Sequence, residues 1–312
     1  MELAHTKVTC SKQSETFTIH HLTDLHDGSP DHAKEALDNR ISMIANDPNA
    51  LWIGGGDYGD LILPTDKRFT PGVVADEWMD AMARIPDFYL ERLTERLAPI
   101  ADKCIGLVSG NHEATIGKNY HRGVAAELAM RLGIPTKYLG DRGWSIVTFE
   151  RNESRVPLRC YSYHGWSAGR LKGRKALQAE RDLGAWNADA FFLGHDHQPY
   201  SDIWYTEETY GTKSGYMLRQ RPRCVLNGGS WTFGQKHPST ETEKRAWRPS
   251  TAPGQSWLEG KNFRPQPPCS PVLLVHLFFG GGSKGNSKTR RAGFDFETRM
   301  LASTHYVGGE VE

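Results

Sequence analysis

The chain has 312 residues, of which 38% are hydrophobic and 24% are charged, and its formal net charge is +1. This composition is typical of a soluble globular protein, and the length allows one large domain. The charge is too small to attract nucleic acid or a membrane over the whole surface, so recognition of an anion must come from a local patch. We expect a single domain over 1–312, with its core motifs in 17–200 and a strand meander with a long loop in 201–312.

The five cysteines are scattered along the chain and form no Cys-x-x-Cys pair. This argues against a disulfide framework or a thiolate zinc site and favours a reducing compartment. The first residues contain no apolar signal core, and no later run approaches membrane-spanning length. We therefore expect a cytoplasmic protein without a membrane partner.

Short apolar runs alternate with helical patterns in the first two hundred residues, as in an α/β protein. The Ser29-Pro30 pair resembles an N-cap followed by proline at the first helical position. Further helices are predicted around 78–97, with a break at Pro86, at 124–132 and in the basic stretch 168–186. The predicted strands are 17–22, 51–53, 104–108, 144–149, 157–163 and 190–193.

After residue 200 the pattern changes to extended runs. Three strands of a meander are predicted at 203–205, 216–218 and 224–226. Residues 234–268 have the composition of a long surface loop, of the kind that is often functional. A closing hairpin is expected from 272–279 and 294–300 around the glycine loop 280–289.

Polar clusters follow five of the apolar runs directly. In open α/β sheets ligands bind at the carboxyl ends of the strands. Two residues spaced two apart in an extended segment leave the same face, so Asp24 and His26 can hold one ion, as can His195 and His197. Each short motif alone is a weak signal. Together they offer imidazole, carboxylate and amide donors, a mixture that suits Mn, Fe, Zn or similar ions. The candidate metal ligands are Asp24, His26, Asp57, Asn111, His164, His195 and His197.

The order of these clusters resembles the calcineurin-like metallophosphoesterase superfamily. Its pattern is Asp-x-His, Gly-Asp-x-x-Asp, Gly-Asn-His-Asp/Glu, a lone His and Gly-His-x-His, and all five blocks are present between residues 24 and 197. The resemblance implies an α/β fold, a four-layer α/β/β/α sandwich of two mixed sheets flanked by helices. It also implies a dimetal site at the strand ends and hydrolysis of phosphate esters by a metal-activated hydroxide.

The resemblance also implies a role for each residue. Asp24, His26 and His197 would hold one ion, Asn111, His164 and His195 the other, and Asp57 would bridge them. His112 would protonate the leaving oxygen or stabilise its charge. Asp60 would orient His112; alternatively, it caps loop amides. Two divalent ions are expected, with Mn favoured over Fe, Zn, Ni or Mg.

Two features bear on the substrate. In the protein Ser/Thr phosphatases of the superfamily an arginine follows the Gly-Asp-x-x-Asp block and clamps phosphate, whereas Leu61 stands there in this chain. A basic run follows His164 and is either a solvated helix face or a rail for a phosphate backbone. Its proposed substrate contacts are Arg170, Lys172, Arg174 and Lys175. We expect phosphodiesters as substrates, with nucleic acid as one candidate. The alternatives are a phosphomonoesterase or protein phosphatase, and an inactive binding scaffold of the same fold.

Overall fold

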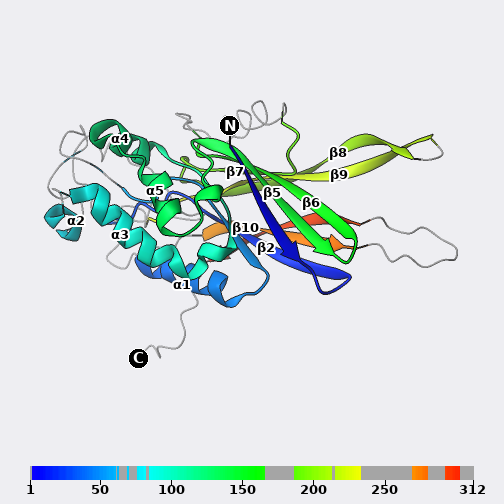
Figure 1. Cartoon of the computed structure of the whole chain (residues 1–312), viewed down its shortest axis with the longest axis horizontal. Coiled ribbons are helices and arrows are strands. Elements are labelled where there is room, and N and C mark those ends of the chain that lie inside the picture. Colours follow the sequence, from blue (N-terminus) through cyan, green and yellow to red (C-terminus); the bar gives the residue numbers. More distant parts are fainter. Residues whose placement is uncertain are drawn as a thin grey trace, which may run out of the picture.

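The computed structural model describes residues 2–60, 62, 69, 76–81, 84–165, 186–212, 215–232, 269–279 and 292–302. Within them, two mixed β-sheets pack face to face, and helices cover the outer face of one sheet (Figure 1). This confirms the predicted α/β class with two mixed sheets. The helix predicted at 168–186, the loop predicted at 234–268 and the glycine loop predicted at 280–289 lie outside the described residues.

The five-stranded sheet carries the first three motif blocks. β2, β3 and β4 run parallel to one another, and β10 and β11 add an antiparallel hairpin at the edge beside β2. The motif segments that follow β2, β3 and β4 therefore all lie at the carboxyl ends of these strands, on the same side of the sheet. In spatial order the strands are β11 (Gly293–Ala302), β10 (Cys269–Phe278), β2 (Ser14–Leu22), β3 (Ala50–Gly54) and β4 (Cys104–Leu107).

The six-stranded sheet carries the other two blocks. β6, β7 and β9 are parallel neighbours, so the residues after β6 and β7 also emerge at a common edge. In spatial order the strands are β1 (Glu2–Thr9), β5 (Arg142–Arg151), β6 (Ser154–Tyr163), β7 (Ala190–Leu193), β9 (Gly215–Asn227) and β8 (Tyr200–Thr212).

The core between the sheets is built by alternating strand residues. On β5, Val147 and Phe149 are fully buried and face β2, where Phe17 meets Phe149 with ring centroids 4.9 Å apart. This spacing of two is what the pleat of a strand requires for one buried face. The two sheets are thus held by a continuous apolar layer.

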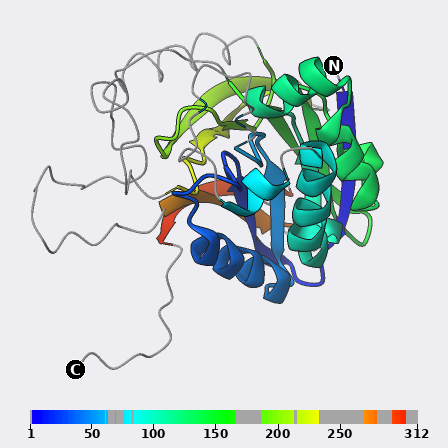
Figure 2. The same cartoon turned by 90° about the vertical axis from the view of Figure 1, so that its left-hand side faces the viewer.

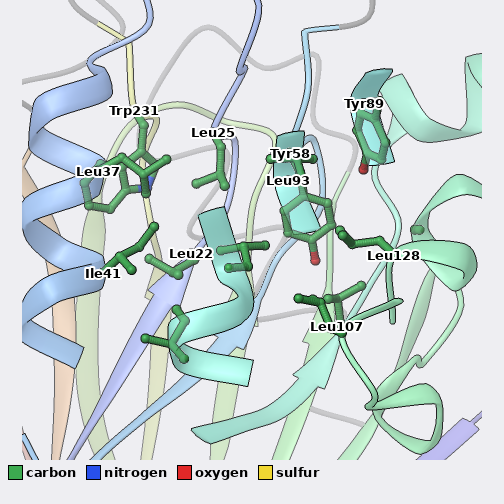
Figure 3. Packing of buried hydrophobic residues seen from close by; sticks show 14 of the residues in the cluster. Leu22, Leu25, Leu37, Ile41, Tyr58, Tyr89, Leu93, Leu107, Leu128 and Trp231 are labelled. Carbon is green, nitrogen blue, oxygen red and sulfur yellow. The ribbon is translucent and has the colours of Figure 1, made fainter. Parts of the chain in front are cut away.

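The helix layer packs on the other face of the five-stranded sheet (Figure 3). Leu37 and Ile41 of α1, one helical turn apart, lie beside Trp231, while Tyr58 lies between Leu93 of α3 and Leu107 of β4. Burying a leucine or isoleucine side chain contributes about 1.5 to 3 kcal/mol to the free energy of unfolding. Figure 2 views the molecule from this helix-bearing end. The helices are α1 (Lys34–Asn46), α2 (Asp76–Asp80), α3 (Ile85–Leu97), α4 (Asn111–Tyr120) and α5 (Val124–Arg131), with 3-10 turns at Ala98–Lys103 and Pro135–Lys137.

Several boundaries differ from the sequence predictions. α1 begins at Lys34, because Ser29 belongs to a turn in which its N–H donates to the carbonyl oxygen of His26. Asn111 and His112, which follow the predicted strand 104–108, form the first turn of α4. Pro86 stands at the start of α3, where its missing N–H costs nothing.

The C-terminal part contains two long strands where three short ones were predicted. β8 and β9 pair over their whole length and extend beyond the body of the molecule as a hairpin, at the right of Figure 1. The predicted closing hairpin is confirmed as β10 and β11. None of the helices in the described ranges has both the length and the apolar character needed to cross a membrane.

Candidate metal centre

The backbone at the strand ends is unusual where the candidate ligands lie. Seven described non-glycine residues have positive φ, and five of them are candidate ligands, with φ between 48° and 68°. L-residues seldom adopt this left-handed conformation, which costs of order 1 to 3 kcal/mol and is concentrated at functional sites. The five ligands are Asp24, His26, Asp57, His195 and His197.

The first cluster combines the loops after β2 and β7. His197 Nε2 lies 3.3 Å from Asp24 Oδ1 and 2.9 Å from His26 Nε2. On its other side, His26 Nδ1 lies 2.9 Å from Asp60 Oδ1. Since that carboxylate can accept the Nδ1 proton, His26 is oriented with its Nε2 toward Asp24 and His197. These three side chains could hold one metal ion.

The second cluster combines the loops after β3, β6 and β7 with the start of α4. His164 Nε2 lies 3.0 Å from Asp57 Oδ2 and 3.1 Å from Asn111 Oδ1, and His195 Nδ1 lies 2.8 Å from the same amide oxygen. Asp57, His164 and His195 could hold an ion, and the amide oxygen of Asn111 adds a fourth donor.

The donor chemistry of both clusters fits a divalent cation. His164 Nδ1 lies 2.7 Å from the carbonyl oxygen of Gly55, which can only accept, so Nδ1 carries the proton of the neutral ring. Its Nε2 lone pair then faces two further acceptors, on Asp57 and Asn111. Acceptors that converge in this way need a proton or a cation between them, and N/O sets of this kind bind Mn, Fe or Zn.

The pKa values of His164 and His26 are raised, whereas burial and the charge of His164 lower that of His195. Burial opposes a charge on His164, but the hydrogen bond and charge of Asp57 outweigh it and raise the pKa of His164 to about 10. Burial likewise opposes a charge on His26, but Asp60 raises its pKa to about 9. Burial would raise the pKa of Asp24, yet the hydrogen bond with His197 and the neighbouring imidazoles lower it to about 2.

The two clusters are joined into one site. The backbone N–H of His195, a member of the second cluster, donates to both carboxylate oxygens of Asp24 in the first, at 3.1 and 2.9 Å. The Asp57 carboxylate also accepts the backbone N–H of His112 at 2.9 Å. All seven predicted ligands thus lie in these two clusters and their connections. The assignment of Asp57 as the bridging ligand stays a prediction.

His112 lies beside the clusters in the first turn of α4 and is buried. Its Nε2 is 3.9 Å from Asp57 Oδ2, and its ring centroid is 4.9 Å from that of His26. Its Nδ1 contacts the main-chain carbonyl oxygen of Asp60, while the Asp60 carboxylate bonds His26. His26, Asp60 and His112 form a third cluster that could hold an ion. The orientation of His112 by Asp60 stays a prediction, and the contact between the two residues is made by the Asp60 main chain.

Glu113 supports the site and was not predicted. Its buried carboxylate accepts the backbone N–H groups of Asp57, Tyr58 and Gly110, each at 2.9 Å, and the hydroxyl of Tyr89 at 3.1 Å. It therefore fastens the loop after β3 to the start of α4. Its position three residues after Gly110 is a capping signal that the sequence contained. A Cβ at position 110 would collide with the Asp57 carboxylate, so only glycine fits there.

The proposed substrate contacts Arg170, Lys172, Arg174 and Lys175, and Leu61, lie outside the described residues. Their positions relative to the clusters stay predictions from sequence.

Of the comparisons with known proteins, the one with solved structures gave matches. No family model and no curated protein matches the sequence. Among solved structures, the chain is similar to a conserved uncharacterized protein from Streptococcus pneumoniae, described as a predicted phosphoesterase, with 11% identity and a TM-score of 0.31 over 93% of this chain and 91% of that one.

The architecture and the clusters define the class of protein without reference to that match. It is an α/β protein of two mixed sheets with buried His/Asp clusters, candidate metal sites, at the strand ends. This is the arrangement that the resemblance to the calcineurin-like metallophosphoesterases implied.

Proposed function

We propose that this protein is a dimetal-dependent phosphoesterase. The observation that carries the proposal is the convergence of two imidazole and carboxylate clusters, delivered by separate strand ends and joined through the His195 N–H to Asp24. A histidine or aspartate with a purely structural role does not require several other imidazole and carboxylate groups around it. Mixed N/O donors, positive-φ ligand residues and the raised pKa values of His26 and His164 agree with a site built for cations.

In this proposal Asp24, His26 and His197 hold one ion, Asn111, His164 and His195 hold the other, and Asp57 serves both. Two divalent ions held there would supply charge neutralisation for a phosphoryl group and acidify a bound water molecule. Mn is the ion we favour, and the donor set also accepts Fe, Zn, Ni or Mg.

In this proposal His112 protonates the leaving oxygen. Its Nδ1 contacts the carbonyl oxygen of Asp60, which fixes the ring and leaves Nε2 directed toward the cluster around Asp57. A protonated Nε2 can give its proton to an alkoxide as the ester bond breaks. Asp60 is then a positioning residue for His112 through its carbonyl and for His26 through its carboxylate.

For the substrate class we propose phosphodiesters, with nucleic acid as a candidate. Leu61 stands where an arginine clamp would favour a phosphomonoester dianion, and leucine cannot form the two parallel hydrogen bonds of a guanidinium fork. A diester has a single negative charge and less need of such a clamp. The cations of the 170–175 segment would then contact neighbouring phosphates.

The test is a metal-by-substrate screen of the purified protein. Chelated and dialysed protein is loaded separately with Mn, Fe, Zn, Ni or Mg and assayed on chromogenic mono- and diesters, nucleotides, phosphopeptides, and single- and double-stranded nucleic acid. Turnover of a phosphate ester that disappears on chelation and returns with an ion supports the proposal. Full activity in rigorously metal-free protein, or no turnover with any ion, would overturn it.

A further inference from the structure

We propose a second ligand site, for a nucleoside phosphate, at the end of the sandwich opposite the metal centre. It is a cavity of about 520 Å³ between the first half of β6, the first half of β9 and the β10–β11 ends. The volume is in the range of ordinary small-molecule sites. The lining residues that matter most are Arg155, Arg159, Arg219, Arg221, Phe278 and Phe294.

The cavity is remote from the proposed chemistry. His164 comes nine positions after Arg155 along β6 and its end, which at about 3.3 Å per residue separates the two by roughly 30 Å. In Figure 1 the β8–β9 hairpin, whose first β9 residues line the cavity, projects away from the helices. A ligand in this cavity would therefore not touch the metal ligands.

The cavity is strongly basic in its lining. Among the described lining residues, four arginines from two strands face one carboxylate, that of Asp189. Asp189 is fully buried and accepts from Arg159 Nε at 3.3 Å and from Arg221 Nε. This shared anchor fixes two guanidinium groups in place, and the Arg159 side chain is still 32% exposed. Anchoring of this kind reduces the ordering that a ligand must impose.

The other two arginines, Arg155 and Arg219, form solvent-exposed ion pairs. Arg219 Nη2 lies 2.8 Å from Glu208, and Arg155 Nε lies 3.3 Å from Glu150, with the two arginine side chains 54% and 73% exposed. Exposed ion pairs of this kind contribute little, so a phosphate can replace the carboxylates. Guanidinium groups match phosphate oxygens through parallel N–H donors, which favours phosphate over a single carboxylate ligand.

Apart from Gln220, the rest of the described lining is apolar and includes two aromatic rings. Phe278 and Phe294 are half-buried, and Met217, Pro157 and Pro222 are further apolar lining residues. Aromatic rings and arginine planes both stack on a flat base. A ligand that carries both phosphate and an aromatic base can therefore contact both the arginines and the apolar residues of the lining, whereas inorganic phosphate can use only the arginines.

The test measures binding of a fluorescent nucleoside diphosphate to the full chain by anisotropy. Arg155→Gln/Arg219→Gln removes two exposed cations from the cavity and leaves the Asp189 anchor intact. The matched control is Arg84→Gln/Arg299→Gln, which removes two exposed, ion-paired arginines elsewhere. Thermal melting shows that both variants are folded.

We expect saturable binding by the wild-type protein, and a Kd at least about tenfold higher in the cavity variant and unchanged in the control. Unlabelled nucleoside diphosphate should compete well, inorganic phosphate weakly and the nucleoside alone poorly. Hydrolysis of a small chromogenic diester should be unchanged in both variants. Equal affinities in the cavity variant and the control, no saturable binding by the wild type, or equal competition by the nucleoside would overturn the proposal.

Discussion

The Nε2 atoms of His26 and His197 lie 2.9 Å apart, and the Asp24 carboxylate lies 3.3 Å from the latter. Two imidazole nitrogens at this separation need a proton or a cation between them. A cation that binds only the folded state stabilises it by mass action, by about 2.7 kcal/mol at a free concentration one hundred times its Kd. We therefore expect Mn to raise the melting temperature of chelated protein in calorimetry. Asp24→Asn should reduce this effect, and an identical melting curve with and without ions would contradict the metal assignment.

The second prediction separates metal binding from proton transfer. Asp57→Asn removes a charge that faces His164 at 3.0 Å, so metal content and rate should both fall. His112→Ala should retain both ions and lose about 10² to 10⁴ in rate on a poor leaving group, the usual scale of general acid catalysis. The loss should shrink with a good leaving group, which needs little protonation.

Elemental analysis measures the metal content of the two purified variants, and their hydrolysis rates are measured with a poor and a good leaving group. An empty metal site in His112→Ala would show that this histidine is a ligand and not an acid.

The third prediction concerns the support provided by Glu113. Glu113→Ala leaves three buried N–H groups and the Tyr89 hydroxyl without their acceptor, so the free energy of unfolding should fall by roughly 2 to 4 kcal/mol. Metal affinity should fall too, because the loops of Asp57 and Asn111 lose their common anchor. Tyr89→Phe removes one hydrogen bond, and should cost about 1 kcal/mol with little change in metal affinity. Urea denaturation measures the unfolding free energy and calorimetric titration measures the metal affinity of both variants. Equal losses of metal affinity and stability in the two variants would contradict the role of Glu113 in holding the two loops together.

Much of the site could be predicted because its residues follow short apolar strands. β3, β4 and β7 are brief, fully apolar and bounded by glycine or polar residues, so their carboxyl ends could be located and the polar residues beyond them grouped. The positive φ of Asp57 and the contact of the Asp60 carbonyl with His112 depend on tertiary packing, so no local pattern could show them.

The missed elements have physical reasons. β1 is an edge strand with only Ala4 buried, so it carries little hydrophobic alternation. β9 was predicted as two short strands, 216–218 and 224–226, but Pro222 between them pairs with Tyr205 and the strand continues through it. Ser29 has the residue type of an N-cap, yet its N–H is used in the turn after His26 and the helix begins five residues later.

The fourth prediction is a loss of stability in acid that depends on His20. Burial, together with the charges of Arg40 and Lys103, lowers the pKa of His20 to about 3. The unfolded chain binds a proton below its ordinary pKa of about 6.5, which the folded chain does not. Stability is therefore fully present above that pH and falls as the pH drops toward 3, by up to about 1.4 kcal/mol per pH unit.

His20→Leu should flatten this fall when urea denaturation is repeated between about pH 6.5 and pH 4. The neighbouring His21, whose pKa burial also lowers to about 3, should leave part of the slope in place. His5→Leu is the control, because His5 is exposed on β1. The same slope in all three proteins would show that His20 does not take part.

The last prediction concerns substrate class. Leucine at position 61 cannot clamp a phosphomonoester dianion, and a phosphate backbone could use the cations of the 170–175 segment. We expect diesters to be hydrolysed with higher kcat/KM than phosphoserine or phosphothreonine peptides.

If nucleic acid is the substrate, replacing Arg170, Lys172, Arg174 and Lys175 together by glutamine should weaken its binding. The slope of the logarithm of the binding constant against the logarithm of the salt concentration should also become shallower, by up to about 0.7 to 0.9 for each phosphate contact that is lost. Hydrolysis of a small chromogenic diester, which reaches only the metal centre, should hardly change in that variant. A clear preference for phosphopeptides, with the four cations dispensable, would instead identify a phosphatase.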